Sequence, residues 1–220
     1  MSRMVLATAA LLLLGLALGR PASEETSADP LAQRITYQES GHKFAITIEN
    51  LARRYGIPMG VDLETATTDK AVSVNIVSGT VADALKAIVA QEPGYQWSEV
   101  DRVVNVEPRQ NTNSVLDVRI SEFKVRHAGA DAVQRALVLR PEVQKWLGDN
   151  HLVERTVFSG DILIGKDKPR FPEISLSLRG ATLRTILNRI ARSRGFDGWG
   201  VARWGDHGEY LSLGLSSTTI

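Results

Sequence analysis

Two stretches of the chain repeat one pattern of apolar and polar positions. In residues 72–89 and 174–191, apolar residues first alternate with polar ones, as in a strand with one buried face. They then recur at every third and fourth position, as on one face of a helix. Thr80 and Thr182 stand at the change between the two patterns, where a threonine side chain can cap the start of a helix, and Asp83 completes a capping-box-like arrangement in the first stretch. The same strand-to-helix unit is therefore predicted twice.

The residues on either side extend the match. A preceding helix is predicted to end at Gly56 in the first half, followed by a strand over 57–63, and to break at Pro141 in the second half before resuming. Each half thus reads strand, helix, strand, strand, helix, strand, strand. This order predicts an α+β fold of two tandem βαββαββ-type units, each with two helices packed on a small mixed sheet. The closing strand pairs are expected at 96–101 and 103–107, and at 198–204 and 209–215.

Two polar segments suggest where the units begin and end. Residues 20–33, RPASEETSADPLAQ, have the composition of a linker, with too little apolar surface to fold. A second polar break follows the first unit. The predicted organisation is a signal peptide over 1–19, a flexible linker over 20–33, a first unit over 34–109, a linker over 110–114 and a second, divergent unit over 115–220.

The N-terminal segment has the features of a bacterial Sec-type signal peptide. Arg3 supplies the positive charge, residues 4–18 form an apolar run, and Ala17 and Gly19 place small residues at the −3 and −1 positions of a cleavage site. The alternative is a retained membrane anchor, although a membrane span needs about 20 apolar residues and this run is shorter. A periplasmic or secreted protein is expected, without an integral membrane span after cleavage.

Four segments of the first half carry a resemblance to a known family: they are LARRYGIPMGVD (51–62), VSVNIVSGTVADALKAIV (72–89), GYQW (94–97) and VVNVEP (103–108). Together they resemble the short N-terminal (STN) domain of secretins and TonB-dependent receptors. The resemblance covers residues 35–108 nearly completely. It extends more loosely over residues 115–215, where the match is clear from Ile174 onward and a loop over Ser159–Pro172 departs from the pattern.

The resemblance implies a periplasmic domain that binds other proteins or packs beside copies of itself. In secretins such domains line a ring at the periplasmic mouth of the channel, and in receptors they engage an inner-membrane signalling partner. The expected partners of this chain are therefore envelope proteins or the chain itself.

Charge and cysteine content narrow the possible functions. The formal net charge is +1, and it becomes zero if the predicted signal peptide, with Arg3, is removed. No extended basic field is therefore expected to attract nucleic acid. The chain has no cysteine, which excludes lipid attachment to a cysteine, disulfide bonds and a thiolate nucleophile.

The sequence contains few of the motifs and residue spacings that are typical of enzymes. The four histidines, among them His127, do not have the spacing of paired metal ligands, and there is no Gly-x-Ser-x-Gly motif. We therefore expect no catalytic residue, no metal site and no cofactor. The enzymatic alternative would use His127 and Asp131, which are four residues apart on one predicted helix face, and it would require a deep pocket around them.

The segment GWGVARWGDHG, residues 198–208, is the predicted interaction surface. Two tryptophans, an arginine and a histidine near a glycine-rich turn could form an exposed adhesive tip, although packing at strand edges is the other interpretation of the tryptophans. These residues are Trp199, Arg203, Trp204 and His207. Four arginines on the last predicted helix indicate a solvated face or, alternatively, a surface for an acidic partner; they are Arg184, Arg189, Arg192 and Arg194.

These observations predict a non-catalytic protein-interaction or assembly module of STN type in the periplasm. The alternative is a periplasmic protein that binds a small ligand, a peptide or a saccharide, through the region of Trp199 and Trp204.

Overall fold

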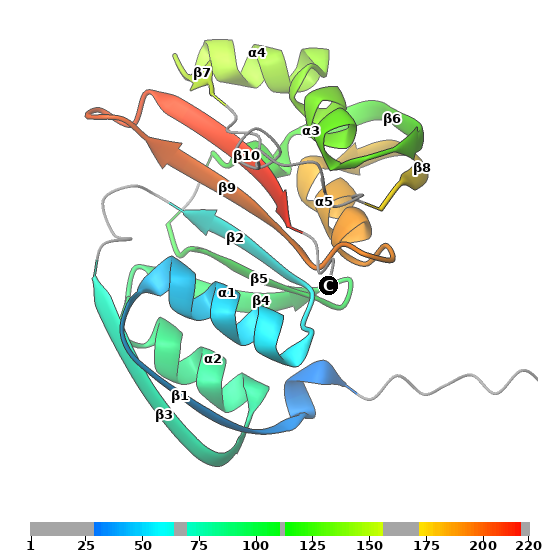
Figure 1. Cartoon of the computed structure of the whole chain (residues 1–220). Helices are drawn as coiled ribbons and strands as arrows, with labels where there is room; N and C mark the ends of the chain where they lie inside the picture. The colour runs from blue at the N-terminus through cyan, green and yellow to red at the C-terminus, as the bar shows by residue number, and fades with distance from the viewer. Residues whose placement is uncertain (1–28, 64–69, 111–112, 156–171, 217–220) are drawn as a thin grey trace, which may run out of the picture.

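A computed structural model describes residues 29–63, 70–110, 113–155 and 172–216. Figure 1 shows the arrangement of the chain. The elements in order are η1 (Pro30–Ala32), β1 (Arg34–Lys43), α1 (Phe44–Tyr55), β2 (Met59–Leu63), β3 (Ala71–Thr80), α2 (Val81–Val89), β4 (Tyr95–Val100), β5 (Val103–Pro108), η2 (Val115–Asp117), β6 (Arg119–Ala128), α3 (Ala130–Val138), α4 (Pro141–Asp149), β7 (Val153–Glu154), β8 (Ile174–Thr182), α5 (Leu183–Ala191), β9 (Gly198–Trp204) and β10 (Tyr210–Ser216).

One six-stranded sheet runs through both halves of the chain, in the order β4-β5-β2-β9-β10-β7. Each half contributes three neighbouring strands, and the halves join where β2 pairs with β9 in parallel. The sheet therefore crosses the boundary predicted at residues 110–114. Two antiparallel ribbons, β1 with β3 and β6 with β8, complete the strands of the described residues.

The predicted α+β fold class is confirmed, but the sheet is more extensive than predicted. The two expected small sheets are continuous because the edge of β2 hydrogen-bonds to the edge of β9. The second half also has a third helix, since Pro141 at a first helical position starts α4 directly after α3. Both halves have the same strand order, β4-β5-β2 and β9-β10-β7. That they are copies of one unit stays a prediction.

The helices of the two halves cover opposite faces of the shared sheet. The parallel register places Met59 opposite Gly198 and Val61 opposite Gly200, so these four residues share one face. Met59 and Val61 belong to the core around α1 and α2. Trp199, one residue along β9, belongs to the core around α3, α4 and α5. The second half is thus turned by half a revolution about an axis that lies in the sheet and crosses the strands.

Local sequence signals fix several element boundaries. The side chains of Thr80 and Asp83 form a reciprocal capping box at the start of α2, as predicted. The Thr182 side chain accepts a hydrogen bond from the backbone of Thr185 at the start of α5. Gly56 ends α1 in the left-handed conformation, with φ of 64°. These signals are local, which is why the sequence alone is sufficient to place them.

Two other predictions concern the ends of the described ranges. The predicted linker over 20–33 ends earlier than expected, because residues 30–32 form η1 and the side chain of Leu31 is buried. The predicted signal peptide, 1–19, lies outside the described residues, as does nearly all of the loop predicted at 159–172. Within the described ranges, no helix has the length and apolar character to cross a membrane.

A polar seam joins α5 of the second half to the sheet of the first half. The Arg184 guanidinium lies 2.6 Å from a Glu107 carboxylate oxygen and 3.4 Å from an Asp117 oxygen. The Asn188 side chain donates to the Val100 carbonyl. Arg184 is only 16% exposed, so it is not part of the solvated arginine face that the helix pattern predicts. It pairs across the junction instead.

Candidate functional site: a groove where the two halves meet

The residues predicted to form one interaction surface lie on two faces of the sheet. Successive side chains of a strand point to opposite faces, so Trp199 and Arg203 lie on one face of β9 and Trp204 on the other. Trp199 is 3% exposed, and its indole N–H donates a 2.8 Å hydrogen bond to Asn188. Trp199 is therefore a core residue at the junction, and an exposed tip containing all four residues is not formed.

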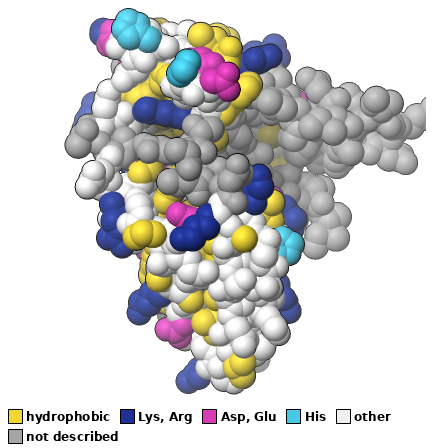
Figure 2. Space-filling model, turned by 90° about the vertical axis from the view of Figure 1, so that its left-hand side faces the viewer, with side chains coloured by type: hydrophobic (Ala, Val, Ile, Leu, Met, Phe, Trp, Pro, Cys, Tyr) yellow, Lys and Arg dark blue, Asp and Glu magenta, His cyan; other side chains and the backbone are white. Residues whose placement is uncertain are grey.

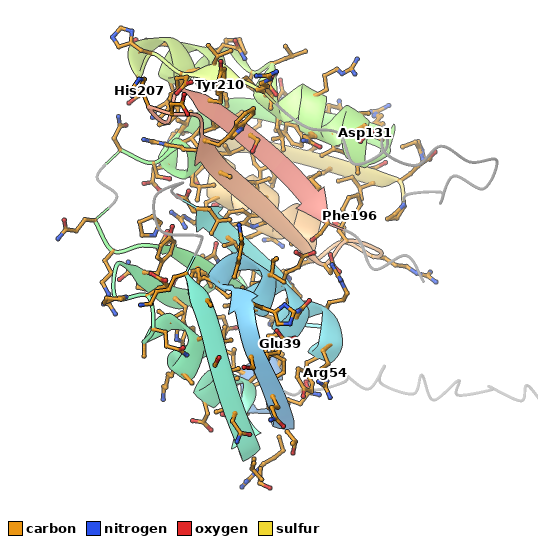
Figure 3. All side chains as sticks on the ribbon, turned by 60° about the vertical axis from the view of Figure 1, so that its left-hand side comes forward. Glu39, Arg54, Asp131, Phe196, His207 and Tyr210 are labelled. Atoms are coloured by element: carbon orange, nitrogen blue, oxygen red, sulfur yellow. The ribbon has the colours of Figure 1, made fainter. Side chains whose placement is uncertain are left out.

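The other three predicted residues lie near the end of the β9–β10 hairpin. The rings of Trp204 and Tyr210 pack together with centroids 4.7 Å apart, and the Arg155 guanidinium lies 5.2 Å from both rings. The Arg203 guanidinium lies 5.5 Å from the Trp146 ring on the opposite face. His207 is exposed at the turn, close to Tyr210 in Figure 3.

The residues of the enzymatic alternative do not form a site. His127 and Asp131 are both exposed, and His127 lies 3.9 Å from Glu173, with its side chain 86% accessible. Figure 3 shows Asp131 on α3, near the surface. Among the described residues, the surroundings of His127 and Asp131 are exposed surface, whereas this alternative requires a deep pocket. Among the described residues, no group of three or more potential ligands could hold a metal ion.

Charged side chains are also dispersed on the one face of the molecule that Figure 2 shows. On the face shown in Figure 2, Lys and Arg side chains are scattered between hydrophobic and acidic ones and do not gather into one basic patch. This face therefore offers no obvious electrostatic footprint for a polyanion.

A groove of about 330 Å³ lies where the two halves meet, on the sheet face that α1 covers. One wall is the α1 surface at Ala45 and Ala52, and part of the base is the β2 surface at Met59, Val61 and Leu63. The groove continues over β9 and β10, where its lining on this face consists of Gly198, Gly200, Gly214 and Ser216. Because both halves line it, the groove depends on the β2–β9 junction. Its volume and mostly apolar lining are typical of small binding sites.

The described helices of the second half, α3, α4 and α5, pack on one face of β9 and β10 and leave the face beside α1 without a described helix of that half. Its residues are all at least partly exposed, while the alternate residues, such as Val201 and Leu213, are buried. We call this surface the open face. It consists of Gly200, Ala202 and Trp204 on β9 and Tyr210, Ser212, Gly214 and Ser216 on β10.

Four glycines lie in these strands near the junction, and two of them are required by packing. A Cβ atom on Gly60 would overlap with the indole of Trp199, which lies directly against the backbone of β2. A Cβ atom on Gly198 would lie 2.6 Å from the Met59 carbonyl oxygen and 2.7 Å from the Ser216 hydroxyl. At both positions only glycine allows the close approach.

Gly200 and Gly214 have no such reason to be glycine. Neither has a positive φ, and among the described residues no atom lies within 4 Å of a Cβ added at Gly200. At Gly214 the nearest atom is the Gly200 carbonyl oxygen, at 3.9 Å. Glycine in a strand interior destabilises a fold by about 0.5–1 kcal/mol relative to alanine. Glycine at these two positions therefore does not stabilise the fold. We call the strand surface at Gly200 and Gly214 the floor of the groove; without side chains there, it leaves room for another molecule.

Few polar groups line the groove. Glu49 and Arg53 form an ion pair along α1. The Gln134 side chain donates to the Leu213 carbonyl, where β7 no longer pairs with β10. Asp197 precedes β9, and its buried Oδ1 has no hydrogen-bond partner among the residues that the structure describes. An unpaired buried oxygen is costly, so Asp197 is the most unusual polar group of the lining.

The opposite face of β2 holds a buried carboxyl group, Asp62. Burial raises the pKa of Asp62 to about 6, although the Arg203 guanidinium and a hydrogen bond from Ser114 act in the other direction. The Ser114 hydroxyl lies 3.3 Å from Asp62 Oδ2. Asp62 therefore links the stability of the junction to pH, and it lies on the side of the sheet away from the groove.

Apart from Trp199, the residues that line the groove were not among those predicted to form a site. A signal was present: glycines at alternate positions, Gly198 and Gly200, stand within a segment that was predicted to be a strand. What the sequence did not contain was the identity of the neighbouring strand and helix, because β2 and α1 lie more than 130 residues away in the chain.

Comparisons of the chain with protein-family models, curated proteins and solved structures find no match. The resemblance to the STN domain therefore stays a prediction, and any function must be argued from the site itself.

Proposed function

We propose that this chain is a non-catalytic binding module of the bacterial periplasm, of STN type, which holds an extended segment of a partner envelope protein in the junction groove. The observation that carries the proposal is the open floor at Gly200 and Gly214, which the packing of the described residues does not explain. A bare strand surface lets another main chain lie close to the sheet.

The surroundings of the floor support the same role. The apolar side chains of α1 provide surface that an incoming segment can bury. The strands β9 and β10 provide a straight surface along which an extended segment can lie. At about 3.3 Å per residue, β9 is long enough to accompany roughly six residues of an extended peptide. The export predicted from the N-terminal segment and the resemblance to a protein-binding family are consistent with an envelope partner.

The proposal is tested by selecting displayed peptides on the full chain and measuring their affinities for two variants. Gly200→Val places a side chain on the floor, in space that the fold leaves free. Asn75→Val introduces the same residue at an exposed position of β3, away from the groove. We expect selected peptides to bind Gly200→Val at least ten times more weakly than the unaltered chain, and to bind Asn75→Val equally well.

Both variants should keep the unfolding midpoint of the unaltered chain to within a few degrees. Equal binding by all three proteins, or a selection that enriches no peptide, would contradict the proposed function.

A second candidate function is the binding of a small saccharide, favoured by the packed rings of Trp204 and Tyr210 at the outer end of the open face. Aromatic faces of this kind can carry a ligand ring. Trp199 is buried and does not contribute to such a site. Titration of the full chain with chitin oligosaccharides should then change the tryptophan fluorescence, and Trp204→Ala should abolish the change; an unchanged spectrum excludes this candidate for these sugars.

A further inference from the structure

The proposed function leaves open which kind of segment the groove accepts, and the lining residues narrow the choice. The groove is small, at about 330 Å³, near the lower limit of ligand pockets. It therefore accommodates one or two side chains and a stretch of main chain, not a folded element. The following inference rests on the proposed function.

The walls favour aliphatic side chains. The apolar side chains that line the groove from α1 and β2 contain no aromatic ring, and they form a continuous surface because α1 packs against β2. Leucine, isoleucine or valine side chains bury apolar area against such a surface without needing a polar partner. The wall residues are Ala45, Ile48, Ala52, Met59, Val61 and Leu63.

The charges of the lining favour a positive group. Among the described lining residues, Glu49 and Arg53 pair with each other. The remaining charged residue of this lining is Asp197, whose Oδ1 is buried and has no hydrogen-bond partner in the described part of the chain. An ammonium or guanidinium group brought near this carboxylate would supply a charge-assisted hydrogen bond and balance the charge. An acidic segment would instead add a like charge beside it.

The geometry points to a basic, aliphatic peptide as the occupant: we propose that the groove binds an extended segment of a partner protein. A leucine, isoleucine or valine side chain of this segment enters the groove against Ala52 and Val61, while a lysine or arginine side chain pairs with Asp197. The main chain of this segment crosses the floor at Gly200 and Gly214.

The test uses three acetylated and amidated hexapeptides, which alternate leucine with lysine, with glutamine or with glutamate. Their affinities for the full chain are measured by calorimetry at low and at physiological salt. The lysine peptide should bind at least ten times more tightly than the glutamate peptide, with the glutamine peptide between them, and the preference should weaken at higher salt.

Two variants separate a specific contact from the general effect of charge. Asp197→Asn and Glu49→Gln change the net charge of the groove by the same amount. Asp197→Asn should reduce the preference for lysine over glutamate to less than threefold, whereas Glu49→Gln should reduce it much less. Thermal unfolding of each variant checks that the fold is retained, and Asp197→Glu should restore part of the preference.

The possible outcomes distinguish a failure of the basic preference from a failure of the proposed peptide-binding function on which it rests. If the three peptides bind equally and Gly200→Val weakens all of them, the groove binds peptides but the basic preference is overturned. If Gly200→Val weakens none of them, or if no peptide binds, both proposals are contradicted. If n-butylammonium binds as tightly as the lysine peptide, the occupant is a small organic cation, which overturns the assignment to a polypeptide.

Discussion

The two hairpins of the shared sheet, β4–β5 and β9–β10, have the same place in their halves but different surroundings. In β5, Val103, Val104, Asn105 and Val106 are all buried. In β10, buried and accessible residues alternate strictly from Tyr210 to Gly214. The first hairpin is covered by α1 and α2 on one face and approached by α5 on the other, because the second half is turned over. Within the described ranges, helices cover the second hairpin on one face only.

This difference shows that the open face follows from how the halves are joined. Strands covered on both faces read as continuous apolar runs, and strands covered on one face alternate. The segment VVNV of β5 and the segment LSLGL of β10 fit these two descriptions. An ordinary solvated face would carry larger polar side chains, however, and the open face carries Gly, Ala and Ser beside α1. The proposed binding role rests on this composition.

The largest loss of stability is expected when a methyl group is added at Gly60, on the face of β2 that Trp199 covers. Gly60→Ala should destabilise the chain by about 3 kcal/mol or more, since its Cβ would overlap with Trp199 and the two strands would have to separate. Chemical denaturation measures the loss. A variant as stable as the unaltered chain would show that Trp199 does not lie against β2.

The second-largest expected change in stability depends on pH. Because the folded state raises the pKa of Asp62 to about 6, the folded chain binds this proton more tightly than the unfolded chain. The contribution of Asp62 is fully present below pH 4 and is lost as pH rises to about 6, which amounts to about 3 kcal/mol. Asp62→Asn should therefore become more stable, relative to the unaltered chain, by about this amount between pH 4 and pH 7. A difference that does not vary with pH would contradict the burial of Asp62 at the junction.

Removing the Asn188 side chain, which contacts both hairpins, should lower the free energy of unfolding by a somewhat smaller amount. The buried Asn188 accepts from the Trp199 indole and donates to the Val100 carbonyl. Asn188→Ala leaves both groups without this partner and should cost about 2 kcal/mol. Equilibrium unfolding in urea tests this. Asn75→Val, an exposed change on β3, serves as the control and should stay within about 0.5 kcal/mol of the unaltered chain.

The smallest effect on stability is expected on the open face. Gly214→Ala should stabilise the chain by about 0.5 kcal/mol, since alanine restricts the unfolded chain and meets no described atom closer than 3.9 Å. The same change should weaken peptide binding. If Gly214→Ala were destabilising by more than about 1 kcal/mol, the floor would be a requirement of folding and the main support for the groove would be lost.

The sequence predicted those features that depend on neighbouring residues. The alternation before Thr80 and Thr182 and the helical pattern after them located β3, α2, β8 and α5, and the cap at Thr80 forms as expected. The break at Pro141 also appears, as the start of α4. These predictions succeed because hydrophobic period and capping act within a few residues.

The site could not be predicted in the same way. Trp199 and Trp204 have similar surroundings in the sequence, yet the first is buried and the second is not. Which face of β9 is covered is decided by the pairing of β2 with β9 and by the packing of α5, and neither leaves a local pattern. For the same reason Gly60 and Gly200 look alike in the sequence, although Trp199 occupies the space above only one of them.

The binding role of the open face is tested most directly by NMR, which locates the backbone amides of the full chain that a bound peptide affects. With a peptide selected on the unaltered chain at saturation, amide shifts should change in α1, in β9 and in β10 from Ser212 to Ser216, and β4 and β5 should be unaffected. Changes concentrated on β4 and β5, or shifts in β9 and β10 that persist unaltered in Gly200→Val, would contradict a binding role for the open face.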